Sequence, residues 1–62
     1  PPADEFLGRV CVVNVQGKKG EMVRVVRRGE KTGRFNLYDL GGREMESDAV
    51  LSKVCPVEWV KL

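Results

Sequence analysis

Seven glycines divide the first 42 residues of this chain into short segments, and this spacing constrains the fold more than any other feature. They are Gly8, Gly17, Gly20, Gly29, Gly33, Gly41 and Gly42. The segments between them are rich in valine, whose branched side chain fits a pleated strand better than a helix. Glycine supplies the unusual backbone angles that tight turns require. The pattern therefore predicts short antiparallel strands joined by tight turns, with little helix.

We expect five strands, over residues 10–15, 21–28, 34–39, 43–46 and 51–54. Ser47 to Val50 is typical of one helical turn, because Ser47 or Asp48 can cap its first free amides. Pro56 has no amide hydrogen, so the last strand cannot continue into the middle of a sheet. The predicted fold class is all-β: a small, strongly bent, five-stranded antiparallel barrel with one short helical turn before the last strand. Six apolar side chains fill its predicted interior: Val13, Val23, Val25, Phe35, Leu37 and Leu51.

The length of 62 residues leaves room for one domain with a small core. We place this domain over residues 1–62, with its core at about 7–54. A chain of this size buries only about 60% of the surface that it exposes when unfolded. The opening Pro1-Pro2 reads as part of a longer protein. No apolar run approaches the roughly 20 residues that span a bilayer, and no signal-peptide pattern is present, so we expect no membrane partner and an intracellular location.

The reactive side chains are few. Cys11 and Cys55 have mainly valine neighbours, which favours free thiols over a disulfide in a chain without secretory features. With no histidine and only two thiols, the chain cannot supply a four-ligand zinc site, and we expect no metal and no cofactor. Neither a Ser–His nor a Cys–His pair can form, and Ser47 and Ser52 have no evident base. We therefore predict that the chain is not an enzyme.

Eleven Lys and Arg against nine Asp and Glu give a formal charge of +2, too small to indicate nucleic acid by itself. The basic residues do cluster around one hairpin. The candidate nucleic-acid contacts are Lys18, Lys19, Arg24, Arg27, Arg28 and Arg34, which could lie along a phosphate backbone. We favour the alternative that these charges keep an exposed hairpin soluble, because few aromatic rings accompany them and base stacking needs such rings.

The segment Leu37-Tyr-Asp-Leu-Gly-Gly-Arg-Glu44 resembles the signature of Tudor domains, which is an aromatic residue, one further residue, and then Asp-Tyr-Gly-Asn followed by a polar strand. The upstream segment Gly8-Arg-Val-Cys-Val-Val13 is similar to the opening strand of that family. The resemblance covers roughly Leu7 to Val54. It implies a bent five-stranded barrel that binds peptides, often through methylated arginine held in a cage of aromatic rings. It also implies an RNA-linked setting: small-RNA silencing, cytoplasmic granules, or chromatin in the nucleus.

The chain departs from that family where the cage should be. The expected cage positions hold Val15, Gly20 or Glu21, Leu37 and Leu40, and the orienting asparagine is replaced by Gly42. We therefore predict a degenerate Tudor domain that binds an unmodified peptide or partner protein, with methylation not required and self-association left open. The predicted partner-binding residues are Val15, Leu37, Tyr38, Leu40 and Gly42, an apolar rim in place of the cage.

Two alternatives stay open. One is a nucleic-acid-binding barrel of the KOW type, in which the basic hairpin over residues 24–34 touches RNA phosphates. Steep dependence of RNA binding on salt would favour it. The other is a structural module that packs on the rest of its parent chain through Trp59 and Val60.

Overall fold

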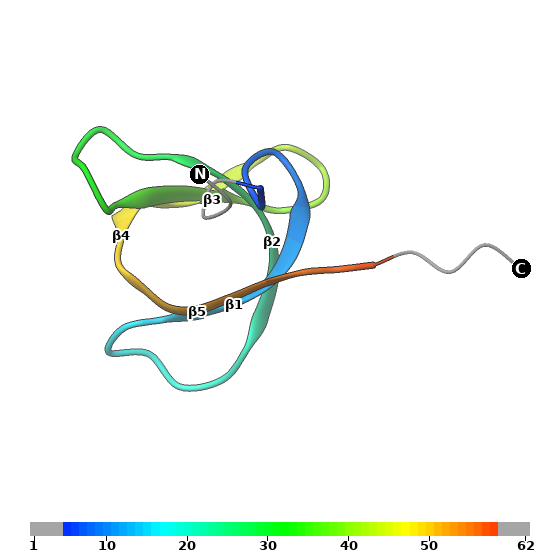
Figure 1. The fold of residues 1–62 in the computed structure, drawn as a ribbon, viewed down its shortest axis with the longest axis horizontal. Helices are drawn as coiled ribbons and strands as arrows, with labels where there is room; N and C mark the ends of the chain where they lie inside the picture. The colour runs from blue at the N-terminus through cyan, green and yellow to red at the C-terminus, as the bar shows by residue number, and fades with distance from the viewer. Residues whose placement is uncertain (1–4, 59–62) are drawn as a thin grey trace, which may run out of the picture.

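The computed structural model describes residues 5–58 and contains one five-stranded antiparallel sheet (Figure 1). Its strands are β1 (Val10–Val15), β2 (Met22–Arg28), β3 (Phe35–Tyr38), β4 (Glu44–Ala49) and β5 (Leu51–Pro56). Their order across the sheet is β4-β3-β2-β1-β5, so β1 to β4 follow one another and β5 returns beside β1. The predicted all-β class and the five antiparallel strands are confirmed.

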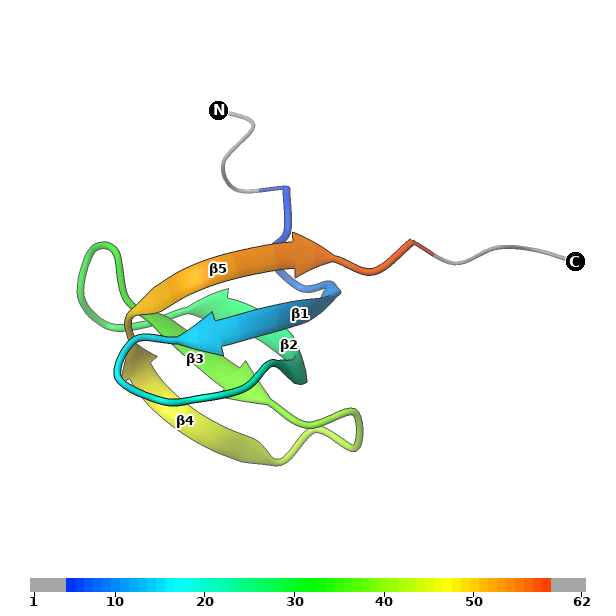
Figure 2. The same ribbon diagram turned by 90° about the horizontal axis from the view of Figure 1, so that it is seen from below.

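The sheet curls so that its two edge strands approach each other where the chain passes from β4 to β5 at Val50 (Figures 1 and 2). Within residues 5–58, β4 and β5 form no ladder with each other, so the sheet is open along this seam and the predicted closed barrel is not confirmed. The β1–β2 turn lies across the seam. The Gln16 amide donates to the Val50 carbonyl at 2.8 Å, and Lys18 forms an ion pair with Glu46.

The predicted helical turn before the last strand is not confirmed either. Ser47 and Asp48 belong to β4, and Val50 is the single residue between β4 and β5. The Asp48 amide donates to the Asn36 side chain at 2.9 Å, and one Asp48 carboxylate oxygen accepts from the Glu30 amide at 2.6 Å. Asp48 therefore bonds to distant parts of the chain instead of capping a local turn, and it does so at a φ of 51°. Aspartate tolerates this left-handed conformation better than most residues.

The core lies on the concave face of the sheet. Its buried members are Cys11, Val13, Val15, Val26, Leu37 and Ala49, with Phe6, Leu7, Met22, Phe35, Leu51 and Val54 packed against them. The predicted interior positions Val13 and Leu37 are confirmed as fully buried, and Phe35 and Leu51 contribute partly. The prediction for β2 is wrong: Val23 is 45% exposed, and Val26 is the buried residue of that strand.

The pairing of β2 with β1 explains this error. Cross-strand partners share a face, and the buried Cys11 and Val13 pair with Arg24 and Met22. Arg24 therefore lies on the core face, which its long aliphatic stem permits. Its guanidinium donates to the Val23 carbonyl at 2.8 Å, although its buried Nε atom has no acceptor. The apolar residues of β2 fit either alternation, and the register with β1 selects the one that buries Val26.

Pro56 lies where an edge strand can hold it. The Val57 amide donates to the Val10 carbonyl at 2.9 Å, so the nitrogen of the preceding Pro56 faces the free edge of β5. Proline has no amide hydrogen to offer there, and the ladder with β1 loses no bond. Pro56, which has no amide hydrogen, and the charged Lys53 earlier in β5 both disfavour pairing of this edge with another chain. The expectation that proline limits the last strand to an edge is met.

Both cysteines are free thiols, as predicted, and they lie on opposite faces of the β1–β5 pair. Cys11 is buried and Cys55 is exposed. Burial is the main cause that raises the pKa of Cys11, with Cys55 adding to it and Arg9 opposing it. A raised pKa leaves less thiolate at any given pH, and only the thiolate reacts.

We therefore expect the folded chain at pH 8 to react quickly with a thiol-specific colour reagent at one site, and the second site to react only as the chain unfolds. Counting thiols with and without denaturant checks this. Equal reaction rates of both thiols in the folded protein would contradict the burial of Cys11.

Candidate binding surface

The convex face of the sheet, turned away from the core, carries apolar side chains at its centre, flanked by the polar pairs Arg27–Asn36 and Asn14–Lys53. The register places two rows of side chains across it: Val10, Val25 and Tyr38 in one row, and Cys55, Val12 and Val23 in the other. None of these side chains is fully buried. A contiguous apolar surface of this kind on a small domain is typical of a contact site for another molecule.

A pocket of about 300 Å³ lies at the end of the first row. It is lined by Val25, Arg27, Tyr38, Asp39, Leu40 and Gly42. Val25 and Tyr38 are cross-strand partners on β2 and β3, and Leu40 lies at the tip of the hairpin that joins β3 to β4. Leu40 is 63% exposed. The pocket thus combines an apolar part, from Val25, Tyr38 and Leu40, with a charged part, from Arg27 and Asp39.

Asp39 fixes the hairpin that presents Leu40. One oxygen of its carboxylate accepts from the amides of Gly41 and Arg43, both at 2.9 Å. Its own amide donates to the Arg43 carbonyl at 2.9 Å, which closes a loop of three residues. Gly42 adopts a φ of 91°, as the last residue of such loops commonly does. The Gly42 amide donates to the Asp39 carbonyl at 3.0 Å. These four hydrogen bonds hold the loop that carries Leu40 in position.

One aromatic ring lies at this pocket. Tyr38 donates its hydroxyl to Glu44 at 3.3 Å, which ties the ring to β4. Phe6 and Phe35 instead pack edge to face against each other beside the core, with centroids 5.4 Å apart. Among residues 5–58 no cage of rings surrounds the pocket, and Trp59 lies outside the described residues.

No family model, curated protein or solved structure matches this chain. The site must therefore be interpreted from its own chemistry. Across the described range, no three side chains of the metal-binding types come together. No helix in that range is long and apolar enough to cross a membrane.

The structure divides the predicted partner-binding residues into two groups. Tyr38, Leu40 and Gly42 come together in the outer pocket. Val15 and Leu37 do not reach any surface rim, since they are 7% and 0% exposed and belong to the core. The reason is register: both occupy the concave face of their strands, so an apolar side chain there stabilises the fold and is not available to a partner.

Three residues of this pocket were not predicted as partner-binding residues: Val25 was predicted in the core, Arg27 as a nucleic-acid contact, and Asp39 in no site. The alternation of Val23 and Val25 with Arg24 predicts that both valines face the core, but the pairing with β1 places them on the outer face. The correct phase would have placed Val25 and Arg27 together on the outer face beside Tyr38. The run Asp39-Leu-Gly-Gly42 is typical of a turn, and this pattern indicates the role of Asp39 in fixing the hairpin.

The predicted nucleic-acid contacts do not form one surface. Lys18 is paired with Glu46 at the seam, and Arg24 lies on the core face. Arg27 belongs to the outer pocket, whereas Lys19 is exposed and lines neither pocket. The two remaining residues, Arg28 and Arg34, line a second pocket of about 220 Å³. The structure therefore distributes these charges over several parts of the molecule.

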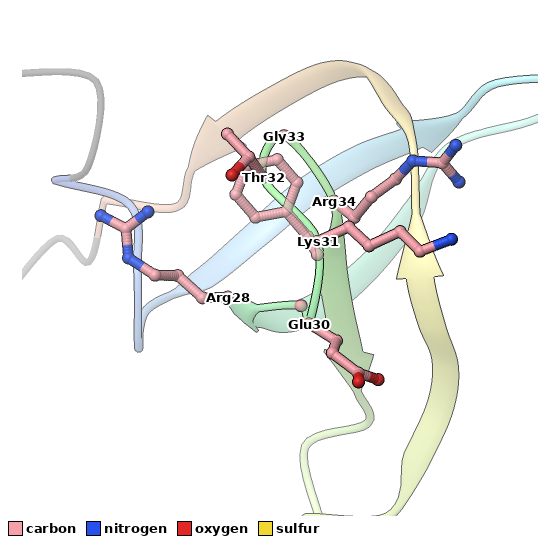
Figure 3. Close-up of a pocket in the computed structure, with 8 residues that line it drawn as sticks. Arg28, Glu30, Lys31, Thr32, Gly33 and Arg34 are labelled. Atoms are coloured by element: carbon pink, nitrogen blue, oxygen red, sulfur yellow. The ribbon is translucent and has the colours of Figure 1, made fainter.

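The second pocket lies in the β2–β3 turn and is lined by residues 28–35 (Figure 3). In Figure 3, Arg28 extends to the opposite side of the loop from Lys31 and Arg34. The Gly29 amide donates to the Arg34 carbonyl at 2.8 Å, and the Arg34 guanidinium donates to the Asp48 carbonyl at 3.1 Å. Because its cations diverge and one of them fastens the loop to β4, this pocket is the weaker candidate for a ligand site.

Proposed function

We propose that this chain is a non-catalytic, Tudor-like protein-interaction module that binds an unmodified peptide segment of a partner protein. The observation that carries this proposal is the outer pocket. It brings the half-buried Val25 and Tyr38 together with the exposed Leu40 on one face of the sheet and hairpin. Small binding sites are typically concave and mostly apolar, with a few fixed polar groups.

The Tudor-like part of the proposal is supported by the signature segment over residues 37–44 together with the curled five-stranded antiparallel sheet. We extend it to a barrel that closes along the seam between β4 and β5, where the β1–β2 turn already bridges the gap through Gln16 and Lys18. The resemblance also supports an intracellular, RNA-linked setting, in small-RNA silencing, RNA granules or chromatin. Self-association through the same outer face is compatible with this function.

The ligand is proposed to be unmodified because the pocket offers one ring where a methyl-arginine cage needs several. Cation–π attraction contributes roughly 0.5–2 kcal/mol for a cation enclosed by ring faces. Val25 and Leu40 have no such ring quadrupole, so they attract an apolar side chain instead. Methylation of a target arginine is therefore expected to change the affinity by no more than a few-fold.

A peptide array that presents each sequence with plain and with dimethylated arginine, followed by calorimetric titration of the strongest binder, tests the proposal. Replacing Leu40 with glutamate is expected to weaken binding by about tenfold or more, because a charged side chain replaces the apolar contact with the ligand. Met45→Glu is the matched control. Met45 is 45% exposed on β4 and lines neither pocket, so its replacement should leave affinity within about threefold, as surface changes usually do.

Two results would overturn the proposal. A dimethylated peptide that binds tenfold more tightly than its plain form would mean that a cage exists. Failure of every peptide, together with RNA binding that falls steeply with salt, would replace this function with nucleic-acid binding.

A further inference from the structure

We propose that the outer pocket selects peptide segments in which an acidic residue lies two positions from the apolar residue that enters it, and that Arg27 makes this selection. This inference rests on the proposed function, since it names the class of peptide that the same pocket takes.

Three charged groups lie in or near the pocket: Arg27, Asp39 and Glu44. Within residues 5–58, the Arg27 side chain joins no hydrogen bond or ion pair, although it lines the pocket and is exposed. The two acidic groups nearby are already engaged. Asp39 binds two amides of its own turn, and Glu44 accepts the hydroxyl of Tyr38. Arg27 is thus the charged group at the pocket with all its donors available to a ligand.

Arg27 and Val25 lie on the same face of β2, at a spacing that an extended peptide can match. Arg27 follows Val25 by two residues on β2, so both side chains lie on the outer face, about 7 Å apart along the strand. A peptide that lies extended along β2 also repeats its side-chain direction every two residues. An apolar side chain placed over Val25 and Leu40 therefore brings the side chain two positions away to the Arg27 guanidinium. The planar fork of arginine binds a carboxylate through two parallel hydrogen bonds.

The charge of Arg27 disfavours a basic residue at this position of the peptide. A lysine or arginine at the same peptide position would meet the Arg27 charge. Asp39 could offset this repulsion only partly, because one of its carboxylate oxygens is occupied by the Gly41 and Arg43 amides. The pocket is therefore selective for acidic over basic peptides. A single exposed ion pair changes affinity by about fivefold at most.

Three fluorescein-labelled peptides test this, identical except that a leucine is followed two positions later by glutamate, glutamine or lysine. Fluorescence anisotropy at low salt should give the order glutamate, glutamine, lysine, with a difference of up to about fivefold between the first two. Arg27→Glu should reverse the order of glutamate and lysine. Lys19→Glu changes the net charge by the same amount at a position that lines neither pocket, and it should leave the order unchanged.

A fourth peptide keeps the glutamate and has alanine in place of the leucine. This peptide separates the acidic selection from the proposed function. If the three leucine peptides bind equally and the alanine peptide does not, the acidic selection is wrong and the proposed function stands. If none of the peptides binds, both are wrong. If the glutamate peptide binds equally well with alanine, or if the Lys19→Glu variant also reverses the order, the preference is a general effect of charge and the assignment to Arg27 is overturned.

Discussion

Replacing Leu37 with alanine is expected to leave the chain largely unfolded at 25 °C. Leu37 is fully buried on β3 and belongs to the central cluster with Val13 and Val26. Removing a buried leucine side chain costs about 2–5 kcal/mol, from lost burial and from the cavity that remains. A 62-residue domain with one small core has a free energy of unfolding on the order of a few kcal/mol. Circular dichroism during urea denaturation measures the loss.

Leu40→Ala is the matched control, because it makes the same chemical change at a leucine that is 63% exposed. Its free energy of unfolding should stay within about 0.5 kcal/mol of the parent value. Equal destabilisation by the two substitutions would contradict the assignment of Leu37 to the core and Leu40 to the surface.

Gly29→Ala should produce the second large effect. A methyl group at Gly29 would lie 2.9 Å from the carbonyl carbon and oxygen of Arg34 and would overlap the Asp48 carboxylate. The Arg34 atoms are backbone atoms of the turn, and the Asp48 carboxylate holds that turn to β4 through the Glu30 amide. Neither neighbour can give way without breaking a hydrogen bond. Overpacking of this kind costs about 1–3 kcal/mol.

Gly41→Ala provides the comparison for that prediction. The nearest atom to a methyl group at Gly41 is an Asp39 carboxylate oxygen at 3.4 Å, and Gly41 does not have a positive φ. The substitution should be neutral, or it should stabilise the chain by about 0.4–1 kcal/mol because alanine restricts the unfolded state. A Gly29→Ala variant as stable as Gly41→Ala would show that the β2–β3 turn is not packed against Asp48.

The sequence was sufficient to predict much of the sheet. The bounds of β1 were predicted at residues 10–15, because the valine-rich run from Val10 to Val15 ends directly before a glycine turn. In β3 the alternation of Phe35 and Leu37 with Asn36 and Tyr38 gave the correct faces, since only one phase buries both apolar residues. These segments could be predicted because local preference and tertiary pairing agree in them.

The rest depended on contacts between distant parts of the chain. β2 carries apolar residues in both phases, and only its pairing with the buried Cys11 and Val13 decides which phase faces the core. The segment after Glu46 continues as strand because Asn36 and Glu30 bond to Asp48, two partners that no local pattern indicates. The same limitation applied to the candidate site. Leu37 is buried because it lies on the core face of β3, whereas Leu40 is exposed because it lies in the loop beyond the end of that strand.

The most direct test of the outer pocket is an NMR titration of the isotope-labelled chain with the strongest plain peptide from the array. Binding at the proposed site predicts amide shifts concentrated at Val25, Arg27 and residues 38–42, where the pocket lies. The turn over residues 28–35, which lines the other pocket, should change little. Shifts concentrated in that turn, with the signals of residues 38–42 unmoved, would contradict the assignment of the binding surface.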